Sequence, residues 1–304
     1  MALFNNLKPK NSITHMKFKF FLMAFISAVS AAILFSACSE NATDPAPASA
    51  NVSLRLEPVA GNQVFDTNTV VQISGRNARI NQARIYISEI ALIRENNEEV
   101  RFTDEPLSVR YIRGVGDTAI LNITDKIILF RHDAGQREAV LGSAPTGRYK
   151  AIRFTVGLND QVNKIDALEV ARLRPNHPLA RTSPPQPGNW WSWNTGYIFT
   201  RVEGFFDNSP TGTGTPTTRF FYHIGGPTGF ASVITLSQPF EIRAGENNVV
   251  PIQVDYARCF TGIDLATSPN CMVIRDPARF PDDRRLGEQF RDNQRAANVF
   301  RFRP

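Results

Sequence analysis

The segment that decides the fold reads Gly188-Asn189-Trp190-Trp191-Ser192-Trp193-Asn194-Thr195-Gly196-Tyr197-Ile198-Phe199. It contains all three tryptophans of the 304-residue chain. An indole is large and has one N–H donor, so it favours positions that offer both packing and a hydrogen-bond partner. The cluster therefore indicates either a layer of the hydrophobic core or a binding site, and in a strand Trp191 and Trp193 would lie on one face.

Short stretches rich in β-branched and aromatic residues flank this segment and are bounded by Gly, Pro, Asn and Asp. Residues 52–56 and 83–88 alternate apolar and polar side chains with the period of a half-buried strand. The same pattern is found at residues 149–156, 219–224, 232–236 and 248–255. Many such strands joined by loops predict an all-β protein, an antiparallel β-sandwich with long loops.

Helical signals are few. Asp282 and Asp283 precede an Arg-containing stretch to residue 297, which predicts a short C-terminal helix with acidic residues at its start. A second short helix is predicted at residues 165–173. Residues 174–189 contain five prolines and are expected to form the loop that leads into the tryptophan cluster.

The N-terminus has the features of an export signal. Lys17 and Lys19 precede an apolar run over residues 20–35, which ends in Ser36-Ala37-Cys38. Residues 34–38 resemble a bacterial lipobox, which implies cleavage before Cys38 and lipidation of its thiol. We therefore expect a signal peptide at 1–37, a flexible tether at 38–50 and a single domain at 51–304. Ser39 after the lipidated Cys38 suits an outer-membrane lipoprotein facing the periplasm or the surface.

Charge and cysteine content narrow the class of protein. Residues 1–37 hold four Lys and no acid, so the remainder has 30 basic against 28 acidic side chains and a net charge of +2. This near-neutral balance removes the electrostatic argument for binding nucleic acid. Cys259 and Cys271 remain in the exported chain and are predicted to form a disulfide, whereas a soft metal site would need more thiolates or imidazoles.

Several segments resemble the MbnP-like family, the methanobactin-associated copper-binding proteins and their relatives among bacterial surface lipoproteins. The Trp191-x-Trp193-Asn194-x-Gly196-Tyr197 core is the specific element. The other segments follow in the family's order: Ala83-Arg84-Ile85-Tyr86-Ile87-Ser88-Glu89-Ile90, residues 147–158, Glu203-Gly204, and Phe221-Tyr222-His223-Ile224-Gly225-Gly226.

The resemblance implies an exported β-sandwich that binds copper in order to sequester or deliver it. In the family, histidines act as ligands together with a tryptophan oxidised to kynurenine, and a di-haem peroxidase-like partner can carry out that oxidation. His223 and Trp191 or Trp193 are the residues that this implies here. Neutral imidazole suits copper, and the aromatic amine of kynurenine can also donate to the metal.

Other residues complete this hypothesis. His177 enters the ligand set because the proline-rich loop could fold it back toward the tryptophans, whereas His132 follows an apolar run and is interpreted as a strand end. Glu203 is expected either to hold the tautomer of a ligand histidine or to end a strand at the surface. Gly196, Gly225 and Gly226 are expected at a bulge or turn.

Rival interpretations stay open at this stage. The tryptophans could be core or rim packing, and His223 could be a hydrogen-bonded core imidazole. The chain would then be a cell-envelope binding or structural lipoprotein without metal. The sequence contains no Gly-x-Ser-x-Gly, P-loop, His-Glu-x-x-His or dinucleotide signature, so we expect no enzyme, and a polysaccharide hydrolase would rest on analogy alone.

Overall fold

The smaller sheet is built on two strands whose apolar residues recur at every second position. In the computed structural model, which describes residues 48–61, 63–181, 188–192, 194–226, 229–296 and 298–303, β1 (Ser49–Ala60) buries Leu54 and Leu56. β15 (Asn248–Asp255) buries Val250 and Ile252. The strands run parallel, with Leu54 beside Val250 and Leu56 beside Ile252, so both apolar rows face the same side.

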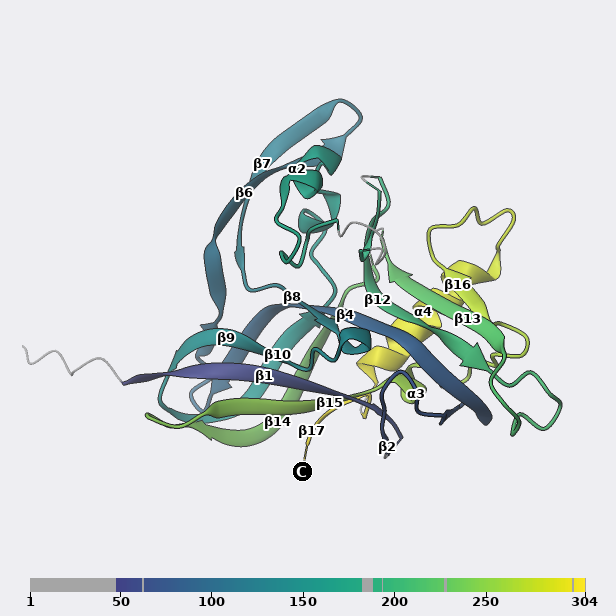
Figure 1. The fold of residues 1–304 in the computed structure, drawn as a ribbon. Coiled ribbons are helices and arrows are strands. Elements are labelled where there is room, and N and C mark those ends of the chain that lie inside the picture. Colours follow the sequence, from purple (N-terminus) through teal and green to yellow (C-terminus); the bar gives the residue numbers. More distant parts are fainter. Residues whose placement is uncertain are drawn as a thin grey trace, which may run out of the picture. The chain divides into compact units, whose positions relative to one another are not determined.

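Three further strands complete this sheet, in the order β17-β15-β1-β2 with β9 also paired to β1 (Figure 1). Their bounds are β2 (Gln63–Val64), β9 (Glu138–Pro145) and β17 (Phe300–Phe302). All of these additional pairings are antiparallel.

The larger sheet is organised around β4 (Arg76–Arg94), which is long enough to pair with several strands along each edge. Its path runs β14-β10-β4-β12-β13-β16, and β3, β5 and β8 pair with β4 while β11 pairs with β12. The bounds are β3 (Val71–Ile73), β5 (Glu99–Arg101), β8 (Ile128–Arg131), β10 (Gly147–Val156), β11 (Trp190–Ser192), β12 (Gly196–Phe206), β13 (Thr218–Gly225), β14 (Ser232–Ile242) and β16 (Asn270–Met272).

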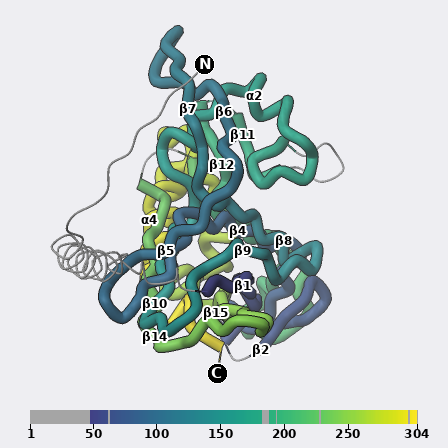
Figure 2. The backbone as a smooth tube through the Cα atoms, turned by 90° about the vertical axis from the view of Figure 1, so that its left-hand side faces the viewer, coloured from purple at the N-terminus to yellow at the C-terminus, as the bar shows by residue number. Residues whose placement is uncertain are grey.

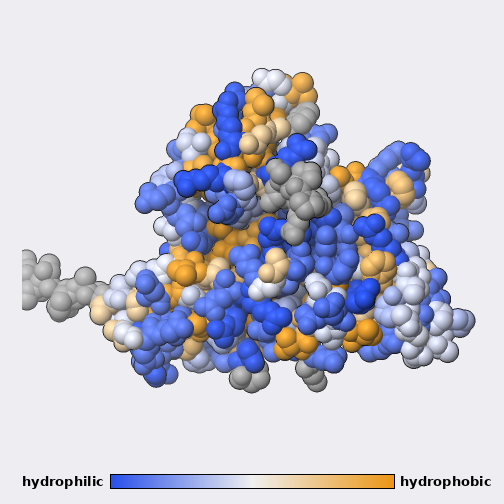
Figure 3. Space-filling view, in the orientation of Figure 1, coloured by the Kyte–Doolittle hydropathy of each residue, from blue (hydrophilic) through white to orange (hydrophobic). Residues whose placement is uncertain are grey.

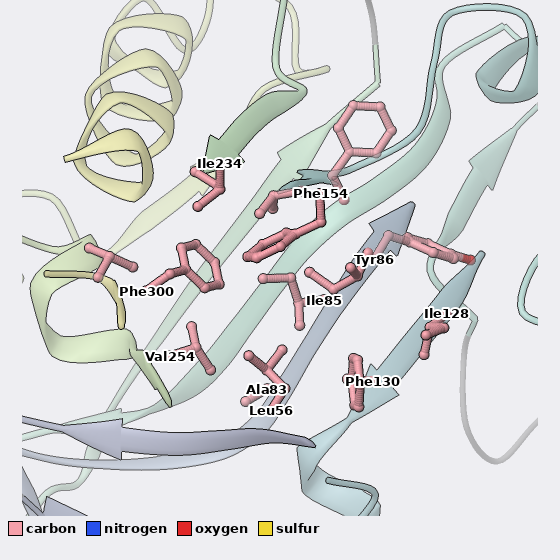
Figure 4. Close-up of a cluster of buried hydrophobic side chains, with 14 of the residues drawn as sticks. Leu56, Ala83, Ile85, Tyr86, Ile128, Phe130, Phe154, Ile234, Val254 and Phe300 are labelled. Atoms are coloured by element: carbon pink, nitrogen blue, oxygen red, sulfur yellow. The ribbon is translucent and has the colours of Figure 1, made fainter. Parts of the chain in front are cut away.

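The core lies between the two sheets (Figure 4). Leu56, Val254 and Phe300 from the smaller sheet face Ile85 and Phe154 from the larger one. The Phe154 and Phe300 rings meet edge to face at 5.4 Å, a geometry worth about 1 kcal/mol beyond burial. The predicted β-sandwich is confirmed, and the opposite face of the larger sheet is left to carry polar side chains.

A two-stranded ribbon, β6 (Thr103–Gly114) and β7 (Asp117–Asp125), extends away from the sandwich. Figures 1 and 2 show it beside α2 (Ala167–Arg172), and an ion pair from Arg110 to Glu169 joins the two. Apolar surface is visible on this part of the molecule in Figure 3. Val115, in the turn between the two strands, is fully exposed, and Ile120 in β7 is 64% exposed.

The C-terminal helix α4 (Asp282–Arg295) closes one side of the larger sheet. Its buried residues recur every three or four positions, at Asp283, Leu286, Phe290 and Gln294, which gives one face for packing. Phe290 packs on Tyr222 of β13 at 5.7 Å between ring centroids. The short helices are η1 (His132–Ala134), η2 (Val162–Lys164) and α3 (Tyr256–Cys259).

Most elements agree with the sequence-based predictions, including α4, α2 and the six strands. The strand directions differ in two places, because β1 pairs with β15, and β13 with β16, in parallel. Parallel neighbours need a long crossover, and each of these pairs joins strands that are far apart in the sequence.

The predicted disulfide requires correction, because Cys259 and Cys271 are both buried free thiols. The Cys259 thiol on α3 donates to the carbonyl of Asp255 at 3.6 Å. The Cys271 thiol on β16 donates to the carbonyl of Asp283 at 3.2 Å. Each thiol is therefore satisfied by its own backbone partner in an apolar environment.

The leader and the lipobox, including Cys38, lie outside the described residues, as do Trp193 and residues 182–187. Within the part of the chain that the structure describes, no helix has the length and hydrophobicity needed to cross a bilayer.

Candidate functional site

His223 and Glu203 meet on the outer face of the larger sheet. β12 and β13 pair with Arg201 opposite His223 and Glu203 opposite Phe221, so strand alternation directs all four side chains to the same face. The His223 Nε2 atom lies 2.8 Å from Glu203 Oε1. Both residues are buried, at 8% and 4% exposure, although they face away from the core between the sheets.

Two arginines hold the carboxylate in place. Arg201 Nε donates to Glu203 Oε1 at 2.6 Å, and Arg219 donates to Glu203 Oε2 at 2.9 Å. Burial alone would raise the pKa of Glu203, but the hydrogen bond from His223 and the charge of Arg201 lower it to about 2. Glu203 is therefore ionised at neutral pH and can act only as an acceptor.

The protonation of His223 follows from this partner. Burial lowers the pKa of His223, against the opposing effect of its bond to Glu203, so the imidazole is neutral at pH 7. We assign its proton to Nε2, because the ionised Glu203 needs a donor there. The Nδ1 atom then carries a lone pair, and it is buried without a hydrogen-bond partner.

Aromatic rings enclose the imidazole. The Trp191 and Phe221 rings lie 6.4 Å and 5.4 Å from the His223 ring, measured between centroids. The Nε1 atom of Trp191 is buried without a partner, like the Nδ1 atom of His223. Buried polar atoms in native proteins are nearly always paired with protein, water or a ligand, so these two atoms in neighbouring rings make the surroundings of His223 a candidate site.

Glycines and one asparagine position Trp191. Gly226 has φ +75°, and a Cβ there would lie 2.8 Å from the Thr195 carbonyl oxygen and 3.1 Å from Trp191 Cζ3, so glycine suits this position beside the indole. Asn163 accepts from the Tyr197 amide at 2.8 Å and donates to the Gly226 carbonyl. A Cβ at Gly196 would lie 2.3 Å from Asn163 Oδ1, which explains the glycine at the start of β12.

The neighbouring Trp190 has a different setting. It packs against the hydrophobic core, and the Arg181 guanidinium lies 5.8 Å from its ring centroid. Trp191 is thus the tryptophan that the described structure places beside His223.

His177 does not join His223. It lines a cavity with residues of β8 such as Leu129 and Arg131, and its Nδ1 accepts from the Leu179 amide at 3.1 Å. β8 and β12 flank opposite edges of β4, and β13 lies beyond β12. Three strand spacings therefore separate β8 from β13, roughly 14 Å. The described part of the proline-rich loop does return to the tryptophan segment, because the Tyr197 hydroxyl donates to the Leu179 carbonyl at 2.9 Å. His177 itself lies beside β8 instead of His223.

His132 is a core residue. It is 6% exposed, its Nδ1 lies 3.0 Å from the Tyr256 hydroxyl and its Nε2 lies 3.0 Å from the Leu56 carbonyl. Both ring nitrogens are therefore used, and its position directly after β8 agrees with the strand-end interpretation.

Sequence reasoning missed Arg201, Arg219 and Asn163. The alternation of Arg201 with Glu203 was a usable signal, because residues two apart in a strand share a face. Nothing local connects Asn163 to the site. Among the described residues, no group of three or more His, Cys, Asp and Glu could hold a metal ion.

Comparisons with known proteins identify the family. The MbnP family model matches residues 49–273. A solved structure described as MbnP from Methylosinus trichosporium is 18% identical, covering 74% of this chain and 83% of that chain with a TM-score of 0.47. A search of the curated proteins returned no match. Because the family model covers well over half of the sequence, the chain belongs to the MbnP family.

Proposed function

We propose that the protein binds copper at His223 and serves to sequester or deliver the metal rather than to catalyse a reaction. One observation carries the proposal: the buried Nδ1 of His223 has no partner, while its Nε2 is held by Glu203. Ligand histidines typically have this arrangement, in which one nitrogen faces the metal and the other donates to a carboxylate. Family membership gives copper as the metal to test first.

The residues present fit such a metal. Neutral imidazole is a good copper ligand, and burial keeps His223 neutral at physiological pH. Glu203 would fix the tautomer of the ligand, and Arg201 and Arg219 would fix Glu203. The copper ion would accept the lone pair of the His223 imidazole. This chain would supply that donor, hold it in orientation and limit the access of water.

An oxidised tryptophan is part of the same proposal. Trp191 is the candidate that lies beside His223, and Trp193 is the other. Peroxide delivered through a di-haem peroxidase-like partner would add two oxygen atoms across the indole C2–C3 bond, which breaks. Two peroxides are reduced to water, the indole loses four electrons, and hydrolysis then releases formate to leave kynurenine.

Attachment to a membrane completes the proposed role. The lipobox-like sequence ending at Cys38 supports a lipid anchor at the outer membrane, with the tether leading into β1. Metabolic labelling with a fatty acid, compared between the wild type and Cys38→Ala, tests this point independently of copper.

Copper loading tests the central proposal. The full chain is incubated with copper and dialysed, and bound metal is measured by elemental analysis. About one equivalent is expected for the wild type, and His223→Ala should lose it, whereas His177→Ala should retain it because His177 lies against β8. Copper that is absent from the wild type, or unaffected by His223→Ala, would overturn the proposal. Peptide mass spectrometry of protein from the native host tests for kynurenine separately.

A second candidate is a cell-envelope binding module without metal. The exposed apolar residues of the β6–β7 ribbon favour it, because Val115 in the turn and Ile120 in β7 are both accessible to solvent. Val115→Asp should then abolish the envelope role while leaving copper binding unchanged, which separates the two candidates.

A further inference from the structure

The short strand β16 places a methionine next to His223. β13 and β16 pair in parallel, with Met272 beside His223 and Cys271 beside Tyr222. Cys271 and Tyr222 are fully buried in the core, so strand alternation directs Met272 and His223 together to the outer face. Neighbouring strands lie about 4.8 Å apart, which is within the reach of a flexible methionine side chain.

The backbone around Met272 is held firmly. The Val273 amide donates to the His223 carbonyl at 3.4 Å, and the Arg275 amide donates to the Met272 carbonyl at 2.9 Å. Arg275 also forms an ion pair with Asp283 of α4. β16 is therefore held by β13 through backbone hydrogen bonds and by α4 through the Arg275–Asp283 ion pair, which keeps Met272 beside His223.

We propose that Met272 donates its thioether sulfur to the metal bound by Nδ1 of His223. The inference rests on the proposed function and adds a ligand to it. Met272 is the single methionine after residue 23 of the sequence. It supplies the second protein donor that His177 and His132 cannot supply from their positions.

Ligand softness makes Cu(I) the ion with which a Met272 ligand is tested. Thioether sulfur is a soft donor and prefers Cu(I), whereas Cu(II) favours a planar set of nitrogen and oxygen donors. Among the described residues, no cluster of His, Cys, Asp and Glu exists that would offer such a set.

The positive charge around His223 also favours a monovalent ion over a divalent one. The negative charge of Glu203 is shared by Arg201 and Arg219, so the surroundings of His223 are positive before any metal binds. A monovalent ion therefore meets less repulsion than a divalent ion, and the difference is larger near the buried Arg201 than near the exposed Arg219.

The test compares the full chain with three variants, Met272→Leu, Ile274→Leu and His223→Ala. Cu(I) affinity is measured anaerobically by competition with a chromogenic chelator, and Cu(II) affinity is measured in a separate titration. Leucine has nearly the shape of methionine and lacks sulfur. Ile274 is a matched apolar control, because it lies beside Gly226 in the same region.

Nuclear magnetic resonance gives a direct readout. The full chain is labelled at the methionine methyl carbon, and the Met272 signal is assigned by its absence from Met272→Leu. Addition of Ag(I), a redox-inert substitute for Cu(I), should shift this signal and leave those of the other methionines unchanged. The shift is measured in the wild type. If Met272→Leu fails to fold, the assignment is made on protein cleaved before Cys38, in which Met272 is the single methionine.

The inference predicts that Met272→Leu weakens Cu(I) binding by at least about tenfold, leaves Cu(II) binding nearly unchanged, and that Ile274→Leu resembles the wild type. If the methyl signal does not move and Met272→Leu binds Cu(I) like the wild type, Met272 is not a ligand. Loss of copper from His223→Ala in that case would leave the proposed function intact. Failure of the wild type to bind either ion would overturn both.

Discussion

His132 should make the folded state sensitive to mild acid. Its imidazole is buried between the Tyr256 hydroxyl and the Leu56 carbonyl. Burial lowers its pKa from 6.5 to about 3, the bond to Leu56 opposes the shift, and the charge of Arg137 adds to it. In the unfolded chain the imidazole takes up a proton near pH 6.5, so between pH 6.5 and 3 the unfolded state binds more protons and stability falls as the pH is lowered.

The size of the effect follows from these two pKa values. At pH 7.5 both states are neutral and His132 contributes almost nothing to the pH dependence. At pH 5.0 protonation of His132 in the unfolded state lowers the free energy of unfolding by about 2 kcal/mol. Below pH 3 this reduction approaches about 5 kcal/mol. His132→Gln cannot take up a proton. The wild type should therefore lose about 2 kcal/mol more than the variant between pH 7.5 and 5.0.

Urea unfolding followed by tryptophan fluorescence at both pH values measures this difference. Gln can replace only part of the hydrogen bonding, so the variant is expected to be less stable at pH 7.5, and the comparison concerns the change with pH. His177→Gln is the matched control, because burial also lowers the pKa of His177 but that residue is only half-buried. If the wild type and His132→Gln lose the same free energy, His132 is not neutral in the folded state and the reasoning fails.

Three further predictions concern the site and its support. Glu203→Gln should reduce copper affinity by about 10–100-fold in the loading assay, because Glu203 orients the ligand His223. It should also destabilise the fold by about 3 kcal/mol, because buried Arg201 loses its counter-charge. Unchanged values for both affinity and stability would contradict the role assigned to Glu203. Thiol reagents should label Cys259 and Cys271 only after unfolding, and a reducing agent should leave the melting temperature unchanged; early labelling would show that they are accessible. Phe290→Ala should cost about 3–5 kcal/mol in urea unfolding, and a smaller loss would mean that α4 packs weakly on Tyr222.

Local periodicity was sufficient to predict most strands, because alternation is a property of adjacent residues. β15 was expected with the bounds that it has, and α4 was expected from its acidic start. The parallel pairing of β1 with β15 could not be predicted in this way, because register between distant strands depends on the whole core. The predicted disulfide failed for a similar reason, since the fold places each thiol against a backbone carbonyl of its own.

The candidate site was predictable in part. The sequence indicated His223, Trp191 and Glu203, and the structure brings them to one face. It gave no sign of Met272, because β16 is three residues long and has no periodicity to detect. His177 was placed in the ligand set on loop composition alone, and composition cannot determine on which side of β4 a loop will lie.

Asn163 has a consequence for how such a site could be altered or transferred. Its single amide joins the start of β12 to the end of β13, although it belongs to η2 and to neither strand. A third element therefore holds together the two backbone segments that lie next to Trp191 and His223. Grafting the tryptophan and histidine segments onto another β-sandwich would transfer the donor residues without the Asn163 hydrogen bonds that hold the two segments at their spacing. Variation at η2 could retune the site while every ligand stays the same.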